Sequence, residues 1–352
     1  MGEISIDEIM EGARKLIGSE AAVMRMGDKK KLKVPAQRTG LPQLDLALGV
    51  KGIPKGRIVE IFGPASSGKT TLSLTIAAQA QKKNGWVWIG DMEHALDPEW
   101  AEKLGVDMDK LLISQPDNGE QALDLANYLV KTGVVDITVI DSVAALVPRK
   151  ELEGESGDSV MGLQARLMSQ AMRKMSPAVS KTGCIAIFIN QIREKIGVVY
   201  GSPETTPGGR ALKFYAGIRL DIRRTGNEKD GEEIVGSSHK IKVIKNKVAP
   251  PFKICEAMLN FENGFDFVEN LFDTGVGQEI IMKKGNTYTY EDKVLGVSRN
   301  KAIKGLREYS KEDLDEIYDL ILVDKVKVEE QPKPVESLEK QLASIPPVVE
   351  QK

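Results

Sequence analysis

The sequence predicts an α/β fold in which helices cover both faces of a mostly parallel, twisted β-sheet. From about residue 57 onward, short β-branched runs alternate with helical segments, a pattern typical of a buried parallel sheet. A glycine-rich turn at 63–70 joins the first of these strands to the first of these helices. The later strands follow one another without long intervening helices, which predicts an antiparallel far edge.

Apolar spacing places the elements of this sheet in order. The expected strands are 57–62, 86–89, 137–140, 184–189, 218–222, 240–244 and 252–259. The expected helices are 69–83, 98–104, 119–132 and 160–180. In such sheets ligands bind beyond the carboxyl ends of the strands, which is where the glycine turn lies.

Further segments flank the core, which we expect at 34–267. Apolar residues at helical spacing over 5–18 predict a helix that docks either on its own core or on a neighbouring subunit. Because this helix has no evident place in the sheet, we expect residues 1–33 to form a helix and strand docking on a neighbouring protomer. A small α/β domain is expected at 268–328. Its expected helices are 276–284, 298–306 and 311–323. Residues 329–352 are rich in Glu, Gln, Pro and Ser and are predicted to be disordered.

Composition limits the possible partners. The formal net charge of −2 means that a nucleic-acid surface would be a local patch. Only two cysteines occur, and this low number suits a reducing compartment. Cys184 begins an apolar run, which is typical of a core position. No apolar stretch reaches membrane-spanning length, and the N-terminus is acidic where a signal peptide is basic. We therefore expect a soluble cytoplasmic protein with no membrane partner.

The glycine turn has the spacing of a phosphate-binding loop. It reads Gly-Pro-Ala-Ser-Ser-Gly-Lys-Thr, and its backbone N–H groups, with the dipole of the following helix, are suited to phosphates. Lys69 is predicted to reach the β- and γ-phosphates and Thr70 to hold Mg²⁺. The nucleotide-binding residues expected here are Gly63, Pro64, Ala65, Ser66, Ser67, Gly68, Lys69, Thr70 and Thr71.

Carboxylates follow two other expected strands. Asp141 ends one of them, and in a phosphate-loop protein such a residue lies beside the phosphates and holds Mg²⁺. Asp91 and Glu93 follow another, and either one could orient and deprotonate an attacking water; spacing does not choose between them. For His94 a structural role is favoured over a catalytic one, and His239 has no evident role.

An amide and two long loops complete the expected site. Gln191 follows the strand 184–189 and leads into a segment at 193–209 that lacks apolar periodicity. Its amide could hydrogen-bond the γ-phosphate and move this loop on hydrolysis, or Gln191 could be a simple loop residue. A second such loop is expected at 153–159, and long loops in compact domains are usually functional.

Longer motifs are more specific than the phosphate loop. Among them are Glu-His-Ala-Leu-Asp-Pro, Val-Ile-Asp-Ser-Val-Ala-Ala-Leu, Met-Ser-Gln-Ala-Met-Arg-Lys, Asn-Gln-Ile-Arg-Glu-Lys-Ile-Gly and Lys-Asn-Lys-Val-Ala-Pro-Pro-Phe. These motifs resemble the bacterial RecA recombinase family, from about residue 5 to residue 325. The resemblance implies a DNA-dependent ATPase with a RecA-like core that forms helical filaments on single-stranded DNA and exchanges strands with a homologous double-stranded DNA. It also implies roles in DNA repair and in self-cleavage of the SOS repressor.

The resemblance implies roles at the ATP site. Glu93 becomes the water-activating carboxylate and Gln191 the γ-phosphate sensor. Asp97 and Trp100 would contact the adenine, although tyrosine is usual at the second position. ATP and Mg²⁺ are the implied cofactors.

Two lysines are implied to act across a subunit interface. Lys245 and Lys247 would reach the neighbour's phosphates, so that hydrolysis depends on filament assembly. From the residues alone, the two lysines are simply a basic strand end.

The loops at 153–161 and 192–207 resemble the family's two DNA-binding loops. The residues implied to hold single-stranded DNA are Arg166, Arg173, Arg193, Lys195, Gly208 and Gly209, with Ile196 and Val198 wedged between bases. Those implied for a second DNA strand or for duplex are Arg223, Arg224, Lys240, Lys242, Lys283 and Arg299. Without the family, Arg166 and Arg173 are ordinary charges on one helix face, since seven residues make about two turns.

Some positions depart from the family pattern, and alternatives remain. Ala65 replaces a common glutamate, and Pro207 replaces a small residue and would stiffen the second loop. Five glutamates and three lysines in 329–352 make the tail less acidic than in many relatives. A hexameric RecA-like helicase is the alternative enzyme. A third hypothesis is a binding scaffold in which the filament promotes self-cleavage of a repressor, a role that is compatible with the recombinase.

Overall fold

The computed structural model describes residues 4–18, 23, 25, 34–155, 162–194 and 203–323. The chain divides into two units, residues 1–322 and 323–352, and every element named below belongs to the first. The predicted disordered tail at 329–352 lies outside the described residues, as does most of the segment in which the N-terminal strand was expected.

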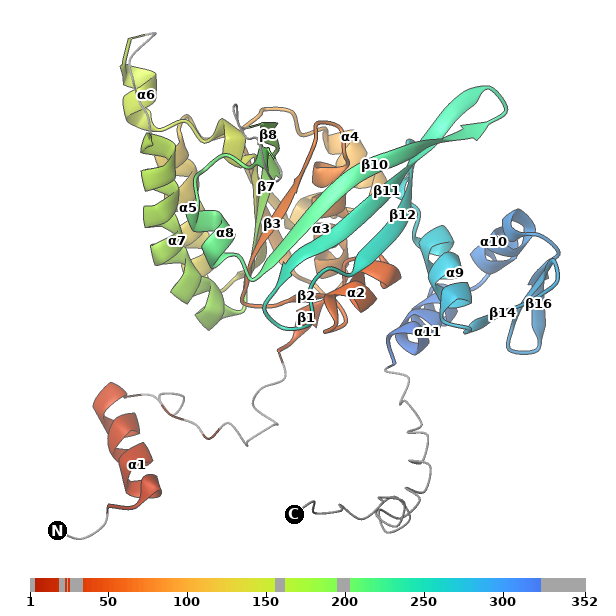
Figure 1. Cartoon of the computed structure of the whole chain (residues 1–352), viewed down its shortest axis with the longest axis horizontal. Coiled ribbons are helices and arrows are strands. Elements are labelled where there is room, and N and C mark those ends of the chain that lie inside the picture. The colour runs from red at the N-terminus through yellow and green to blue at the C-terminus, as the bar shows by residue number, and fades with distance from the viewer. Residues whose placement is uncertain are drawn as a thin grey trace, which may run out of the picture. The chain divides into compact units, whose positions relative to one another are not determined.

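A nine-stranded mixed sheet forms the centre of the core (Figure 1). Its order is β13-β12-β11-β10-β3-β7-β6-β4-β5, parallel from β10 to β5 and antiparallel from β10 to β13. The strands are β3 (Ile58–Gly63), β4 (Trp86–Asp91), β5 (Leu111–Ser114), β6 (Val135–Asp141), β7 (Ile185–Gln191), β10 (Ile218–Asp230), β11 (Glu233–Asn246), β12 (Ile254–Asn260) and β13 (Gly264–Phe265). The predicted parallel sheet with an antiparallel far edge is confirmed.

The structure lengthens two of the expected strands. β10 and β11 pair along nearly their whole length as a long hairpin, which Figure 1 shows extending beyond the rest of the sheet. Their outer halves are largely exposed and polar, so mutual backbone pairing forms them without the apolar pattern on which strand prediction relies. The short edge strand β5 was not predicted, and its middle residues, Leu112 and Ile113, are exposed.

Helices cover both faces of the sheet (Figure 1). One face packs against α2 (Pro42–Leu48), α3 (Lys69–Gln81) and α4 (Pro98–Lys103), and the other against α5 (Gly119–Thr132), α7 (Leu163–Thr182) and α8 (Ala211–Tyr215). Strand side chains alternate between these cores: Ile187 lies in the first core and Phe188 in the second. No helix among the described residues is long and apolar enough to cross a membrane.

Short elements connect these layers. They are β1 (Ala36–Gln37), β2 (Ile53–Pro54), α6 (Arg149–Glu153), β8 (Arg193–Glu194) and β9 (Glu204–Thr205). The pair β1–β2 and the pair β8–β9 are each antiparallel.

A small α/β region follows the main sheet. It consists of α9 (Phe267–Gly277), β14 (Ile281–Lys284), β15 (Thr287–Tyr290), β16 (Lys293–Gly296), α10 (Arg299–Arg307) and α11 (Lys311–Leu322). The helix expected at 276–284 is wrong, because α9 ends at Gly277 and a strand begins at Ile281. Ile281 is buried while Met282 is exposed, which is the two-residue period of a strand.

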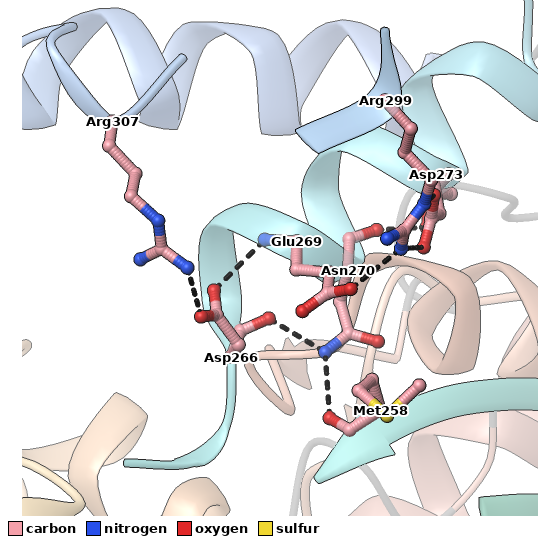
Figure 2. Close-up of polar contacts among 8 residues, drawn as sticks. Met258, Asp266, Glu269, Asn270, Asp273, Arg299 and Arg307 are labelled. Carbon is pink, nitrogen blue, oxygen red and sulfur yellow. Dashed lines mark hydrogen bonds and ion pairs between the residues drawn. The ribbon is translucent and has the colours of Figure 1, made fainter. Parts of the chain in front are cut away.

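Ion pairs join α9 to α10 (Figure 2). The Arg299 guanidinium lies 2.7 Å from a Glu269 oxygen and 2.6 Å from an Asp273 oxygen. Arg307 pairs with Asp266, which also caps α9 by accepting from the Glu269 N–H at 3.0 Å. Arg299 is therefore part of the packing of this region.

A buried carboxylate links α2 to α11. Asp45 is fully buried and accepts hydrogen bonds from the Tyr318 hydroxyl at 2.5 Å and from the Thr39 hydroxyl at 2.7 Å. Burial raises the pKa of Asp45 to about 6, against the effect of these donors. Arg38 stacks on the Tyr318 ring at 4.4 Å from its centre, so this junction combines a carboxylate, a phenol and a guanidinium.

The N-terminal helix has an uncovered apolar face. α1 (Ile6–Ile17) begins with a capping box between Ser5 and Glu8 and ends at Gly18, whose φ is 68°. None of its residues is buried. Its exposed large apolar residues are Ile6, Ile9, Leu16 and Ile17.

We predict that deleting residues 1–33 abolishes self-assembly, because it removes this apolar face, and leaves a folded core that binds ATP. Electron microscopy with single-stranded DNA and a slowly hydrolysed ATP analogue would measure assembly. Circular dichroism would serve as the folding control. Normal filaments from the shortened chain would contradict the prediction.

Candidate nucleotide and nucleic-acid site

The phosphate loop lies at the carboxyl end of β3, immediately before α3. Two of its glycines are required by geometry. Gly68 has a φ of 83°, and a Cβ on Gly63 would lie 2.1 Å from the carbonyl oxygen of Ile222 on β10. Gly68 offers no side-chain cap to α3, which leaves the first backbone N–H groups of this helix available to an anion.

Two side chains of the loop meet partners within the site. The Lys69 ammonium donates to the Pro64 carbonyl at 2.6 Å, and burial lowers its pKa while Asp141 and Glu93 oppose this. The Thr70 hydroxyl donates to Asp141 at 2.6 Å. Burial raises the pKa of Asp141 to about 6, although the Thr70 donor acts in the other direction. A hydroxyl and a carboxylate held together offer the oxygen ligands that Mg²⁺ prefers, so these residues fit that ion.

The two candidate bases have different environments. Glu93 is exposed, and its carboxylate accepts from the Gln191 amide at 3.1 Å and from the Ser142 hydroxyl. Asp91 is only 3% exposed and accepts from two backbone N–H groups of the following loop and from the Gln115 amide at 3.2 Å. The contacts of Asp91 hold the loop in place, which leaves Glu93 as the carboxylate that faces the cavity.

A cavity of about 520 Å³ adjoins the phosphate loop. Residues that were expected at the site and line this cavity are Ala65, Ser66, Ser67, Gly68, Lys69, Thr70, Thr71, Glu93, Asp141 and Gln191. Lining residues with no predicted role at the nucleotide are Ile189, Arg224, Ser237, His239, Leu259 and Phe261. The order of β10, β11 and β12 brings most of this second group to the loop, and no sequence signal near the loop indicates that order.

Asp97 and Trp100 are not in that lining. Asp97 caps α4 by accepting from the backbone N–H groups of Glu99 and Trp100 at 2.9 and 3.2 Å. Trp100 is half-buried and packs against the first core.

Lys245 and Lys247 lie away from the phosphate loop of their own chain. Lys245 pairs across the sheet with Arg219, and the Lys247 N–H donates to the Gly217 carbonyl, which places both lysines toward the amino edge of the parallel strands. The Lys245 ammonium donates to the carbonyls of Lys213 and Phe214 at 2.7 and 3.0 Å. The phosphate loop follows the opposite, carboxyl edge.

The start of α7 adjoins the glycines that end the second loop. Gln164 donates to the Val143 carbonyl at 2.9 Å, and its amide oxygen accepts from the Gly208 N–H at 3.2 Å. A Cβ on Gly209 would lie 2.8 Å from the Ala165 Cβ, so the chain passes close to α7. Arg166 is exposed on that helix, as is Arg173 two turns further on.

A buried amide connects this second loop to the sheet. Asn190 on β7 is fully buried and donates to Glu60 at 3.0 Å and to the Pro207 carbonyl at 3.2 Å. The next residue, Gln191, bonds Glu93 in the cavity. Two adjacent side chains therefore contact the nucleotide cavity on one side and the second loop on the other.

The other predicted DNA contacts differ in their exposure and in the partners of their side chains. Arg193 is exposed on β8, while Lys195, Ile196 and Val198 lie outside the described residues. Arg223 is paired with Glu204 and Asp221, and Arg299 with the two acidic residues of α9. Three exposed lysines have weaker partners: Lys240 lies 3.8 Å from Glu256, and Lys242 and Lys283 lie over aromatic rings. Arg224 faces the nucleotide cavity and donates to Asn227.

Fold and site together define the phosphate-loop NTPase class. A parallel sheet, a glycine loop at a helix start, a Thr–Asp oxygen pair and a cavity-facing glutamate are the parts of such an enzyme.

Comparison with known proteins identifies the family within this class. Residues 5–266 match the family described as the RecA N-terminal domain. The chain is 54% identical over 311 residues to protein RecA of Clostridium beijerinckii, covering 88% of this chain and 86% of the relative. It is 56% identical over 298 residues to protein RecA of Caldanaerobacter subterraneus, covering 85% and 87%. It is 55% identical over 291 residues to protein RecA of Teredinibacter turnerae, covering 83% and 85%.

The chain belongs to the RecA family. It has the activity of that family, a recombinase with DNA-dependent ATP hydrolysis, and it binds ATP and DNA and assembles with itself. The family also places it in DNA repair and the SOS response. The alternative of a hexameric helicase is set aside by the extent of this match.

We predict that Glu93→Gln retains ATP binding and hydrolyses ATP at least about 100-fold more slowly, because a general base contributes about 10²–10⁴-fold. The matched variant Asp91→Asn changes the loop rather than the base, so its main effect should be on stability. Single-turnover hydrolysis and thermal unfolding would measure the two effects. If only Asp91→Asn stops hydrolysis, the roles of the two carboxylates are reversed.

Proposed function

We propose that ATP acts in this recombinase mainly as a switch, which is read by Gln191 and passed to the second DNA loop through Asn190. The single observation that carries this proposal is the adjacency of the two amides, one bonded to Glu93 in the cavity and the other to the Pro207 carbonyl. A γ-phosphate that takes the Gln191 amide from Glu93 would shift the end of β7 and with it the loop.

Hydrolysis itself would proceed at Glu93. The carboxylate accepts a proton from water as the water oxygen attacks the γ-phosphorus, and the bond to the bridging oxygen breaks to leave ADP and phosphate. Mg²⁺, held by Thr70 and Asp141, would supply charge neutralisation on the β- and γ-phosphates. Lys69 would bind the same phosphates, and Asp97 and Trp100 would contact the adenine.

The neighbouring protomer would complete the site. Lys245 and Lys247 lie at the edge of the sheet away from their own phosphate loop, which supports a role at the phosphates of another subunit. Cations supplied in this way make hydrolysis depend on assembly. The N-terminal segment 1–33 would hold the protomers together through its apolar face.

The DNA contacts would be local and directed at phosphates. Arg166, Arg173 and Arg193 are exposed beside the two loops and would hold single-stranded DNA, with the backbone of Gly208 and Gly209. Lys195, Ile196 and Val198 of the second loop would add a cation and two apolar wedges. A second strand or duplex DNA would meet Arg223, Arg224, Lys240, Lys242, Lys283 and Arg299.

The filament would also act on a repressor protein, and it would do so in the cytoplasm. Filaments with bound ATP would promote self-cleavage of the SOS repressor, without needing hydrolysis. Because its DNA substrates lie in the bacterial cytoplasm, the protein would act there.

We predict that replacing Arg166 and Arg173 with alanine weakens binding to all single-stranded sequences about equally. The slope of log affinity against log salt should fall by about 0.7 for each lost phosphate contact. DNA-stimulated hydrolysis should be lost while nucleotide affinity is unchanged. A salt titration by fluorescence anisotropy, with Lys174→Ala on the same helix as the matched control, would measure this. Unchanged DNA affinity would rule out α7 as the primary DNA surface.

We predict that Gln191→Ala uncouples the two ligands. ATP and DNA should each still bind, but ATP should no longer tighten DNA binding, because the side chain that reads the γ-phosphate is absent. DNA affinity measured with ADP and with a slowly hydrolysed ATP analogue would test this, with Gln115→Ala as a control amide outside the cavity. A variant that still binds DNA more tightly with the ATP analogue would show that the switch runs elsewhere.

A further inference from the structure

A histidine lies against the phosphate loop without a part in the chemistry above. His239 on β11 is 2% exposed and lines the nucleotide cavity. Its ring is adjacent to the loop: a Cβ on Gly68 would lie 3.6 Å from Cε1 and 3.7 Å from Nδ1. The ring meets Phe265 edge-on at 5.9 Å between centres, which fixes its orientation.

One nitrogen of the ring has a partner and the other has none. Nε2 lies 2.8 Å from the Ser237 hydroxyl, and Ser237 is itself buried. Nδ1 is buried without a hydrogen-bond partner among the described residues, which is costly for a polar atom. The Ser67 hydroxyl, on the loop, is a second buried polar atom without a partner.

The surroundings favour the neutral ring. Burial lowers the pKa of His239, the nearby Ser67 backbone opposes this, and Arg224 on the paired strand adds to the lowering. A neutral imidazole carries one N–H only. If the Ser237 hydroxyl donates to Nε2, that proton lies on Nδ1, directed at the loop.

We propose that His239 is a positioning residue for the nucleotide: its Nδ1–H donates to the Ser67 backbone carbonyl when the phosphate loop closes on a bound nucleotide, and Ser237 selects the tautomer that allows this. Nδ1 has no hydrogen-bond partner among the described residues, and hydrogen bonds at such sites often tighten only in the complex. The inference rests on the proposed nucleotide site. It adds a residue from a strand far from the loop in sequence, and it explains the Nδ1 atom that otherwise has no partner.

Two conservative substitutions separate the ring nitrogens. The side-chain amide nitrogen of asparagine can take the place of Nδ1, whereas that of glutamine can take the place of Nε2. We expect His239→Asn to bind a fluorescent ADP analogue with Mg²⁺, in the absence of DNA, within about twofold of the unchanged protein. We expect His239→Gln to bind about three- to tenfold more weakly, the range for one neutral hydrogen bond. For ATP hydrolysis, KM should rise in that variant while kcat changes less than twofold.

Controls keep the test independent of folding. Ser237→Ala keeps the His239 ring but removes the hydroxyl that selects its tautomer, so this variant should bind the nucleotide about twofold more weakly. Ser238→Ala, at the next and half-buried position, should have no effect on binding. Thermal unfolding should be similar in the two His239 variants. Equal binding by His239→Gln and the unchanged protein, or equally weak binding by His239→Asn and His239→Gln, would overturn the proposal. Failure of the unchanged protein to bind, or normal binding by Lys69→Ala, would instead overturn the nucleotide site itself.

Discussion

The buried hydrogen bond between Asn190 and Glu60 is the constraint on which the site most depends. Glu60 lies in the middle of β3 and is completely buried, so its charge must be compensated inside the sheet. Arg219 on β10 does so at 2.5 Å, while stacking on the Phe62 ring, and Asn190 on β7 supplies the second donor. Three adjacent strands are thereby tied together directly beneath the phosphate loop.

This network also determines what the neighbouring residues can do. Asn190 uses its second amide hydrogen for the Pro207 carbonyl, so the end of the predicted DNA loop is attached to a buried charge pair whose disruption is strongly destabilising. Gln191 follows it in the strand and therefore points to the other face, into the cavity. If the nucleotide displaces the end of β7, Pro207 would therefore be displaced with it. The two-residue period of a strand is thus the physical basis of the proposed switch.

Much of this arrangement could be predicted from local sequence. The phosphate loop, the terminal Asp141 and the alternating strands are local signals, and so were identified. Spacing could not decide between Glu93 and Asp91 as the general base. The decision depends on which carboxylate accepts hydrogen bonds from the backbone of the loop, and in the structure this is Asp91. Antiparallel pairing at the far edge of the sheet brings three further residues to the cavity: Ser237, His239 and Phe261. No sequence motif at these positions predicts ligand binding. The helix expected at 276–284 is wrong because the four apolar residues in that stretch fit a helix as well as a turn and a strand.

Charge pairing separates the predicted DNA contacts into two groups. Arg166 and Arg173 have no ion pair among the described residues, so a DNA phosphate would gain their full charge. Arg223 and Arg299 each already contact two carboxylates, and DNA bound there would replace one anion with another for little net gain. Single-stranded DNA should therefore occupy the α7 surface first. On the proposed DNA contacts, the paired arginines would contribute only when a second strand, held near them by the filament, competes for them at high local concentration.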